Sequence, residues 1–283
     1  MSETASPVRI TVITVCYDSM AVLPAMLASV PTGTPVVLVD NSPNADPALT
    51  RLAESRGVTL IRNERNLGFG TACNIGAARA ATEFLLFLNP DVTLAEGALG
   101  HLADSLDRFP AASAANPRIA NADGSPFFRR RSLLIPRSQW LPRGWPAETR
   151  EVPTLSGAAL LVRKTAFNAV GGFDPEIFLY HEDDDLSFRL RSIGPLLFVR
   201  DALVTHLGGS STARSAETAA FKAFHMGQSR VHVARKHGIP MPLLSSLAAG
   251  IAQFFSPLTL LSKRKRAKNL AFLRGICTSS KQN

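Results

Sequence analysis

Short apolar runs rich in β-branched residues alternate with helical segments in the first third of this 283-residue chain. The pattern predicts strands over residues 8–15, 35–39, 59–62 and 83–88, and helices over residues 20–30 and 71–81. Strands that alternate with helices indicate an α/β fold, in which a Rossmann-like, mostly parallel central sheet carries helices on both faces.

Polar side chains follow the ends of three predicted strands. Asp18 comes after the first strand, Asp40 and Asn41 come after the second, and Asn89 and Asp91 come after the fourth. In open α/β sheets, ligands bind beyond the carboxyl ends of the strands. We therefore expect these side chains to line one rim of the sheet.

The second half of the chain predicts further strands and helices around a long loop. We expect a loop over residues 116–153, strands over 156–162, 196–199 and 202–204, and helices over 164–170 and 186–192. The loop carries Trp140, Trp145 and the run Phe127 to Arg131, which could contact the phosphate or sugar rings of an acceptor. A merely solvated surface explains the same composition equally well.

Four adjacent carboxylates, Glu182 to Asp185, follow His181. Like charges at this spacing repel one another, so the fold must use them through a bound cation, a proton relay or a helix start. An acidic helix N-terminus complements the helix dipole, and Asp185 and Arg189 would form an i,i+4 pair. The residues alone leave the functional and the structural interpretation open.

The glycine-containing segment 66–71 leads into a predicted helix. Free backbone N–H groups at a helix start can receive a phosphate. The segment lacks the Gly-Lys-Ser/Thr of a Walker loop, and an ordinary turn before a helix is the alternative.

The positive charge of the chain is concentrated near its C-terminus. Eleven of the 31 basic residues follow Glu217, the last acidic residue, so residues 1–217 carry 20 basic against 22 acidic residues. Such asymmetry indicates that the C-terminal part contacts a polyanionic surface, either anionic lipid or nucleic acid.

Residues 239–262 contain no charged residue and are followed by the basic run Lys263 to Arg266 and by Lys268. The apolar residues recur at helical spacing, with Pro257 as an interruption, and they are Leu243, Leu244, Leu247, Ile251, Phe254, Phe255, Leu258 and Leu261. An amphipathic, basic helical tail of this kind suits the surface of an anionic membrane. A helix packed on the protein, a contact with a dimer partner and a spanning helix are the alternatives.

The length and composition accommodate one large α/β domain over residues 1–238 and this tail over 239–283. Cys16, Cys73 and Cys277 are odd in number and lack metal-binding spacing, which favours a reducing compartment. Residues 1–7 show no signal-peptide pattern. We therefore expect a cytoplasmic protein, peripheral at the inner face of the cell membrane.

An ordered series of short motifs runs through residues 8–236. The motifs are Val15-Cys16-Tyr17-Asp18, Val39-Asp40-Asn41-Ser42, Asn66-Leu67-Gly68-Phe69 with Asn74, Leu88-Asn89-Pro90-Asp91, Ser156-Gly157-Ala158, Gly171-Gly172-Phe173-Asp174, Glu182-Asp183-Asp184-Asp185-Leu186, and His206 before Gly208-Gly209-Ser210-Ser211. In order and spacing the series resembles the family 2 glycosyltransferases of GT-A fold, notably the rhamnosyltransferase-like branch.

The resemblance implies a role for each matching position in binding the nucleotide sugar. By this likeness Val15, Tyr17 and Asp40 hold the base and ribose, and Asn66, Gly68 and Phe69 lie along the nucleotide. For Asp40, a residue that caps the turn after the strand is the structural alternative.

The resemblance also implies a divalent cation, Mg²⁺ or Mn²⁺. Asn89, Pro90 and Asp91 stand at the place of the DxD motif. Asn89 replaces the first carboxylate of that motif and would be a weak metal ligand or a contact to the ribose of the nucleotide sugar. Asp91 would reach the cation and His206 would complete the site. For His206, a packed histidine at a strand end is the alternative.

On the acceptor side, the resemblance implies that Asp183 is the catalytic base. Ser156 and Gly157 match the floor beneath the acceptor, and Glu182 lies beside it. The chain departs from the family at Asp18, where Asn is common, and at Leu155, where an aromatic residue is common.

The implied activity is an inverting glycosyl transfer from a nucleotide-diphosphate donor. We expect L-rhamnose from dTDP-rhamnose to move to a saccharide or lipid-linked acceptor in cell-surface polysaccharide synthesis. A nucleotidyltransferase on a related fold is one alternative, although no glycine-rich basic loop follows the first strand. A sugar-nucleotide-binding module without catalysis is the other. We expect no nucleic acid partner and allow for a homodimer.

Overall fold

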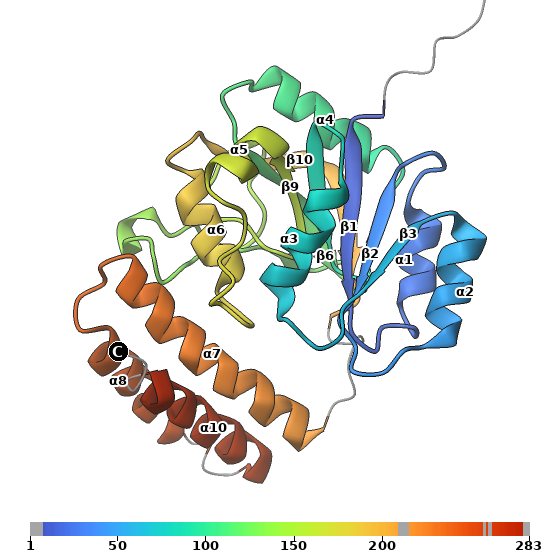
Figure 1. Ribbon diagram of the computed structural model, residues 1–283. Helices are drawn as coiled ribbons and strands as arrows, with labels where there is room; N and C mark the ends of the chain where they lie inside the picture. Colours follow the sequence, from blue (N-terminus) through green and yellow to red (C-terminus); the bar gives the residue numbers. More distant parts are fainter. Residues whose placement is uncertain (1–7, 209–214, 257–258, 260–261, 280–283) are drawn as a thin grey trace, which may run out of the picture.

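The β-strands form one sheet with the order β3-β2-β1-β4-β9-β6-β10-β5 (Figure 1). The computed structural model describes residues 8–208, 215–256, 259 and 262–279. The strands are β1 (Ile10–Cys16), β2 (Val36–Asp40), β3 (Thr59–Arg62), β4 (Phe84–Leu88), β5 (Val92–Leu94), β6 (Ala114–Asn121), β9 (Ala159–Arg163) and β10 (Leu196–His206). Two short strands, β7 (Pro126–Phe127) and β8 (Arg150–Glu151), pair with β6 and β10.

The sheet is parallel in its first half and mixed in its second half. β1 to β4 run parallel to one another, as the alternation of strands and helices predicted. β9 lies antiparallel between β4 and β6, and β5 is antiparallel to β10. The first four strands therefore end at one rim, where polar residues follow them.

Helices cover both faces of the sheet, as predicted (Figure 1). One face packs against α1 (Leu23–Ser29), α2 (Pro47–Arg56) and α4 (Ala98–Arg108), and the other packs against α3 (Phe69–Arg79), α5 (Lys164–Ala169) and α6 (Glu182–Leu190). Alternate residues of β1 point to opposite faces, so Val12 lies in the first core and Ile13 in the second.

Several predicted boundaries differ from the structure: the strand predicted at 156–162 is β9 (Ala159–Arg163), and the helix predicted at 186–192 is α6, which already begins at Glu182. Two further differences concern the long loop and the last strands. The segment 116–153, predicted as a loop, begins inside β6, and it also holds β7, β8 and a 3₁₀ turn, η1 (Arg137–Gln139). β6 contains few β-branched residues and includes Pro117, so its composition is not typical of a strand. The strands predicted at 196–199 and 202–204 are one strand, β10, whose register against β6 shifts between Val199 and Leu203.

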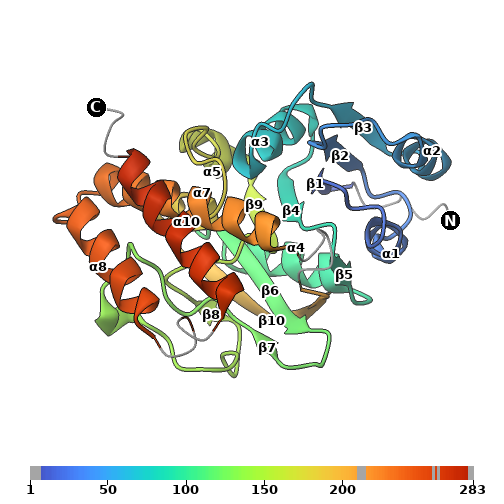
Figure 2. The same cartoon turned by 90° about the horizontal axis from the view of Figure 1, so that it is seen from below.

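Three C-terminal helices lie side by side below the sheet (Figures 1 and 2). They are α7 (Ala216–Lys236), α8 (Pro242–Phe254) and α10 (Lys263–Ser279). α10 crosses α7 at glycines, since a methyl group added at Gly275 would overlap the Phe224 carbonyl oxygen. The tail helices thus pack on α7, which was one of the arrangements that the sequence left open.

Some predicted features fall outside the described residues. They are Gly209, Ser210 and Ser211 of the motif after His206, and Pro257, Leu258 and Leu261 of the tail. Among the residues that are described, no helix combines the length and the apolar character needed to cross a membrane.

Candidate active site

A cavity of about 830 Å³ opens at the rim beyond the ends of β1 and β4. Its wall includes nine residues that the sequence singled out, namely Val15, Tyr17, Asn66, Gly68, Phe69, Asn89, Asp91, Glu182 and His206. Four other predicted site residues, Asp40, Ser156, Gly157 and Asp183, are not part of this wall. The structure thus gathers the residues expected to bind the donor and the metal, except Asp40, and Asp183 follows the wall residue Glu182 directly.

The glycine turn before α3 is fixed by Asn41, which follows β2. The Asn41 amide nitrogen donates to Asn66 Oδ1 at 2.8 Å, and its oxygen accepts from the Leu67 N–H at 3.1 Å. Gly68 has a φ of 85°, and a side chain there would overlap the Phe178 carbonyl oxygen. This turn therefore requires glycine at residue 68.

Asp40 is fully buried and acts as a cap after β2. Its Oδ1 accepts a hydrogen bond from the Ser42 N–H at 3.1 Å, and Arg62 Nε lies 3.6 Å from its Oδ2. The Asp40 side chain therefore caps the turn after β2, as the structural alternative had it, while the neighbouring Asn41 lines the cavity. A role of Asp40 in binding the base or ribose stays a prediction.

Asp91 and His206 meet because their strands pair. β5 begins just after Asp91, and His206 lies opposite Val92 in the antiparallel pairing of β5 with β10. His206 Nε2 lies 3.4 Å from Asp91 Oδ1, and Asp91 is 4% exposed. The buried Nδ1 of His206 has no hydrogen-bond partner among the described residues.

This pair suits a divalent cation held partly by the substrate. No group of three or more His, Cys, Asp or Glu residues in the described part of the chain could hold a metal. One carboxylate and one imidazole leave most coordination positions to phosphate oxygens and water, which Mg²⁺ and Mn²⁺ favour. The donor set therefore fits a cation that binds together with a diphosphate.

Asp183 lies in the first turn of α6, where its carboxylate is held from three directions. Oδ1 accepts from Arg129 Nη2 at 2.7 Å and from the Asp184 N–H at 2.9 Å. Oδ2 accepts from the Gly157 N–H at 3.1 Å. α6 begins at Glu182, so the acidic run is a helix N-terminus as well as a candidate catalytic segment.

Glu182 is the carboxyl of the acidic run that lines the cavity. Burial, and then the neighbouring charge of Asp183, raises the pKa of Glu182 to about 8. Its Oε2 is buried without a hydrogen-bond partner among the described residues. Near neutral pH this side chain therefore carries a proton next to the cavity.

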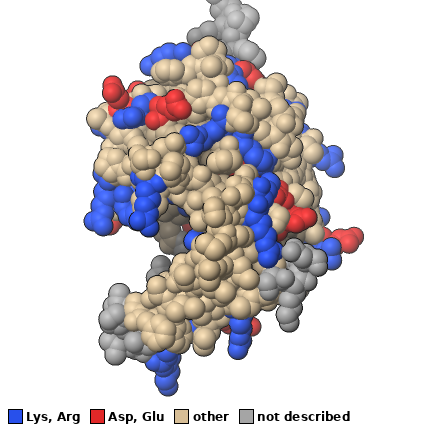
Figure 3. Space-filling view, turned by 90° about the vertical axis from the view of Figure 1, so that its left-hand side faces the viewer, with Lys and Arg blue, Asp and Glu red and all other residues tan. Residues whose placement is uncertain are grey.

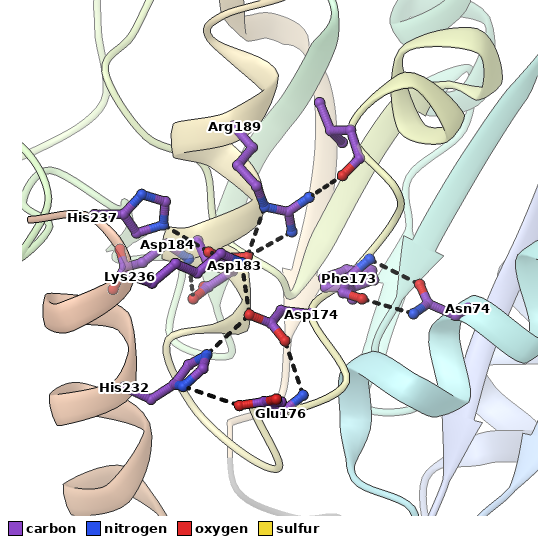
Figure 4. A network of polar contacts seen from close by, with 12 residues as sticks. Asn74, Phe173, Asp174, Glu176, Asp183, Asp184, Arg189, His232, Lys236 and His237 are labelled. Atoms are coloured by element: carbon purple, nitrogen blue, oxygen red, sulfur yellow. Dashed lines mark hydrogen bonds and ion pairs between the residues drawn. The ribbon is translucent and has the colours of Figure 1, made fainter. Parts of the chain in front are cut away.

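Partly buried ion pairs hold the rest of α6 against the end of α7 (Figure 4). Lys236 Nζ lies 2.8 Å from Asp185 and 2.6 Å from Asp174, and His237 Nε2 lies 2.7 Å from Asp185. Arg189 contacts Asp185 at 2.6 Å, as the i,i+4 spacing predicted. Burial alone would raise the pKa of Asp185, but the hydrogen bonds from Arg189 and Lys236 hold it below its usual value.

α7 contributes residues to the cavity that no sequence pattern indicated. Glu217, Thr218, Phe221 and Lys222 all line the wall, together with Phe178, Leu179 and Tyr180 from the segment before α6. These positions carry no motif, and only the tertiary packing of α7 beside that segment brings them to the cavity.

Comparison with known proteins identifies the family. Residues 11–171, which include the glycine turn and the Asn89 to Asp91 segment, match the family model described as glycosyl transferase family 2. The chain belongs to this family. The resemblance inferred from the motif order is therefore confirmed, and this glycosyltransferase is an enzyme.

Curated relatives of this family 2 glycosyltransferase come from mycobacteria. The N-acetylglucosaminyl-diphospho-decaprenol L-rhamnosyltransferase of Mycobacterium tuberculosis is 33% identical in an alignment of 261 positions that covers 80% of this chain and 84% of the relative. The pre-mycofactocin glycosyltransferase of the same organism is 29% identical over 69% of this chain and 41% of its own length.

Solved structures share the fold of this glycosyltransferase at low sequence identity. The mannosyltransferase PcManGT of Pyrobaculum calidifontis, in complex with GDP-Man and Mn²⁺, has a TM-score of 0.60 at 16% identity and covers 97% of this chain and 88% of its own. GalNAc-T7 with UDP, GalNAc and Mn²⁺ has a TM-score of 0.61 at 17% identity, and the match spans 96% of this chain and 56% of that one. These likenesses confirm the GT-A fold.

Proposed function

We propose that this glycosyltransferase moves L-rhamnose from dTDP-rhamnose, with inversion, onto a saccharide carried by a lipid diphosphate during cell-surface polysaccharide synthesis. The observation that carries the proposal is the single cavity shared by the expected nucleotide-binding residues, the Asp91 and His206 pair, and Glu182. The choice of sugar and acceptor rests on the mycobacterial L-rhamnosyltransferase, which is 33% identical over most of both chains.

In this proposal the donor lies along the rim. Val15 and Tyr17, at the end of β1, contact the base and ribose, and the turn around Gly68 lies along the nucleotide. Asn89, Asp91 and His206 surround the diphosphate. A Mg²⁺ or Mn²⁺ ion held by Asp91 and His206 would neutralise the charge of the leaving nucleoside diphosphate.

Asp183 is proposed as the group that removes the proton from the acceptor hydroxyl. Its Oδ2 accepts one backbone N–H, from Gly157, so a second lone pair remains for the hydroxyl proton. As the acceptor oxygen bonds to the anomeric carbon, the bond to the diphosphate oxygen breaks and the proton moves to the carboxylate. The backbone of Ser156 and Gly157 forms the adjacent floor.

A calorimetric panel of dTDP-, UDP- and GDP-sugars, with and without Mg²⁺ or Mn²⁺, tests this proposal. We expect dTDP-rhamnose to bind in a metal-dependent manner, and Asp91→Ala to weaken that binding at least about tenfold. Asp123→Ala, on an exposed turn after β6, is the matched control and should leave binding unchanged. Absence of metal-dependent binding across the whole panel would contradict the proposal.

We also propose that the enzyme works on the inner face of the cell membrane, where α8 contacts the bilayer. Met241, Leu244, Ile251 and Phe255 are 48–67% exposed and recur at helical spacing on one side of α8. The opposite side of the helix, around Gly250, packs on α10. Leu244 and Ile251 of α8, with the flanking Met241 and Phe255, therefore face outward, while Leu243, Leu247 and Phe254 are partly buried.

Basic residues stand next to this apolar stripe. Lys263, Arg264, Lys265 and Lys268 are exposed at the start of α10. Figure 3 shows the lower body of the molecule as largely uncharged, with Lys and Arg side chains at its lower edge. An apolar face beside a cationic cluster complements an anionic lipid surface, where each cation contributes roughly 1 kcal/mol.

Sedimentation with phosphatidylglycerol-containing vesicles tests the membrane proposal. We expect the protein to sediment with the vesicles at low salt, and the double variant Leu244→Asp, Ile251→Asp to remain in the supernatant. Ile193→Asp, which replaces an apolar residue of similar exposure away from α8, is the control. If the double variant instead splits a dimer of the wild type in analytical ultracentrifugation and still binds vesicles, the stripe is a dimer contact.

A further inference from the structure

Four aromatic rings gather where α7 faces the cavity. The His225 ring lies 4.3 Å from Phe178 and 4.5 Å from Phe221 between ring centroids, and Phe224 packs on its other side at 5.3 Å. Phe178 and Phe221 meet edge to face, with centroids 6.0 Å apart. Both of these phenyl rings line the cavity.

Core packing does not account for the position of Phe221. The side chain is 47% exposed, although it lies at the cavity among polar residues such as Thr218 and Lys222. Exposed aromatic surface costs free energy in water, which a ligand with an apolar face would recover. The exposed ring therefore indicates a contact that forms only with ligand.

His225 backs the two phenyl rings as an uncharged group. Burial lowers the pKa of His225, and its Nδ1 is buried without a hydrogen-bond partner among the described residues. A neutral imidazole stacked on Phe178 extends the aromatic surface without adding positive charge. The cluster thus forms an apolar, aromatic part of the cavity wall.

We propose that Phe178 and Phe221, supported by His225, form a platform for the apolar face of a pyranose ring. This inference rests on the proposed function, because it requires a sugar in the cavity. Phe178 adjoins the glycine turn, since its carbonyl oxygen accepts from the Phe69 N–H at 3.1 Å, and it precedes Glu182 by four residues. The platform therefore lies between the expected nucleotide site and the acidic run.

The chemistry of the platform favours a sugar with few hydroxyl groups on one face. Pyranose C–H groups carry partial positive charge and pack on the negative faces of aromatic rings. A deoxyhexose presents a methyl group in place of a hydroxymethyl group, so it offers more apolar surface to two phenyl rings. The donor sugar and the acceptor sugar share this chemistry, and the experiment separates them.

Three substitutions at Phe221 test the platform. In Phe221→Ala and Phe221→Leu we expect sugar binding to weaken roughly 3- to 10-fold, because both remove the ring. Phe221→Tyr keeps the ring and should stay within about twofold of wild type. Phe109→Ala removes a phenyl ring of similar exposure at the end of α4, on the other face of the sheet, and serves as the control.

Two measurements identify the bound sugar. A weaker Kd for dTDP-rhamnose, with no change for dTDP alone, would place the donor sugar on the platform, and a raised KM for the acceptor at saturating donor would place the acceptor sugar there. If the Ala and Leu variants keep wild-type Tm, Kd and KM, the platform is wrong. Failure of the proposed function is distinct, since the wild type itself would then bind no nucleotide sugar.

Discussion

Glu182 and Asp183 are neighbours in the chain, but their carboxyl groups have different surroundings. Asp183 accepts hydrogen bonds from Arg129 and Gly157, which fix the orientation of its carboxyl group. Glu182 lines the cavity with an unpartnered buried oxygen and a raised pKa. At the residue scale, hydrogen bonds thus hold the Asp183 carboxyl group in place, while its neighbour Glu182 carries a proton.

Asp183→Asn tests the base. The amide keeps the shape of the side chain but cannot accept a proton, so we expect sugar transfer to fall by about 10²- to 10⁴-fold. Donor binding should not change, because Asp183 lies outside the cavity wall. Transfer assays and calorimetry on the same preparation give both numbers, and near-normal turnover would remove Asp183 from the mechanism.

Glu182 should make stability depend on pH. Its folded pKa of about 8 lies above the unfolded value of 4.5, so the folded state holds a proton that the unfolded state releases between these values. Stability should therefore fall as pH rises through this window, by at most about 1.4 kcal/mol per pH unit. In urea unfolding at pH 5, 6, 7 and 8, Glu182→Gln should show a flatter dependence than wild type, and parallel curves would refute this assignment.

At the scale of elements, α6 is positioned by the end of α7. Lys236 bridges Asp185 of α6 and Asp174 of the preceding turn (Figure 4). The same turn is connected to α3 through Asn74. The Asn74 side chain donates a hydrogen bond to the Phe173 carbonyl oxygen and accepts one from the Phe173 N–H. These contacts therefore fix the position of the acidic run relative to the glycine turn before α3.

Lys236→Met should weaken the attachment of α6 to the end of α7. Removing the cation leaves two buried carboxylates with fewer partners, and we expect a loss of about 3 kcal/mol in the free energy of unfolding. Lys236→Arg keeps the charge and should recover part of the loss. Chemical denaturation of the three proteins measures this effect. A Met variant as stable as wild type would show that Arg189 and His237 stabilise the Asp185 carboxylate without Lys236.

Most elements around the sheet follow from local patterns, whereas part of the site does not. The apolar runs before Asp18, Asn41 and Asn89 predicted three strands and the rim where they end. Phe221 and Lys222 belong to the cavity only because α7 packs beside the segment 178–182. No local pattern encodes that contact, so the sequence predicted the rim but not the helix across from it.

At the scale of the whole molecule, the C-terminal helices join the catalytic part through α7. The N-terminal half of α7 lines the cavity, its last turn holds α6, and α10 lies along it with glycines at the crossing. Figure 2 shows α8 and α10 next to α7, and Figure 1 shows that the three helices lie below the sheet. The segment predicted as a tail therefore covers a helix of the site.

Two glycine substitutions test this packing. Gly275→Ala places a methyl group against the Phe224 carbonyl and should cost about 1–3 kcal/mol in stability. Gly100→Ala, in α4, has open space around its added methyl group and should be neutral or stabilising by about 0.5–1 kcal/mol. Thermal unfolding of the two variants and the wild type measures these changes in stability. Equal stability of Gly275→Ala and Gly100→Ala would show that α10 does not pack closely on α7.

The most direct test of the account is a crystal structure of the protein with dTDP-rhamnose and Mn²⁺. We predict that the diphosphate lies beside Asp91 and His206, with the base near Val15 and Tyr17 and the sugar in the same cavity. A nucleotide sugar bound elsewhere, with Asp91 and His206 contacting neither metal nor phosphate, would contradict the account.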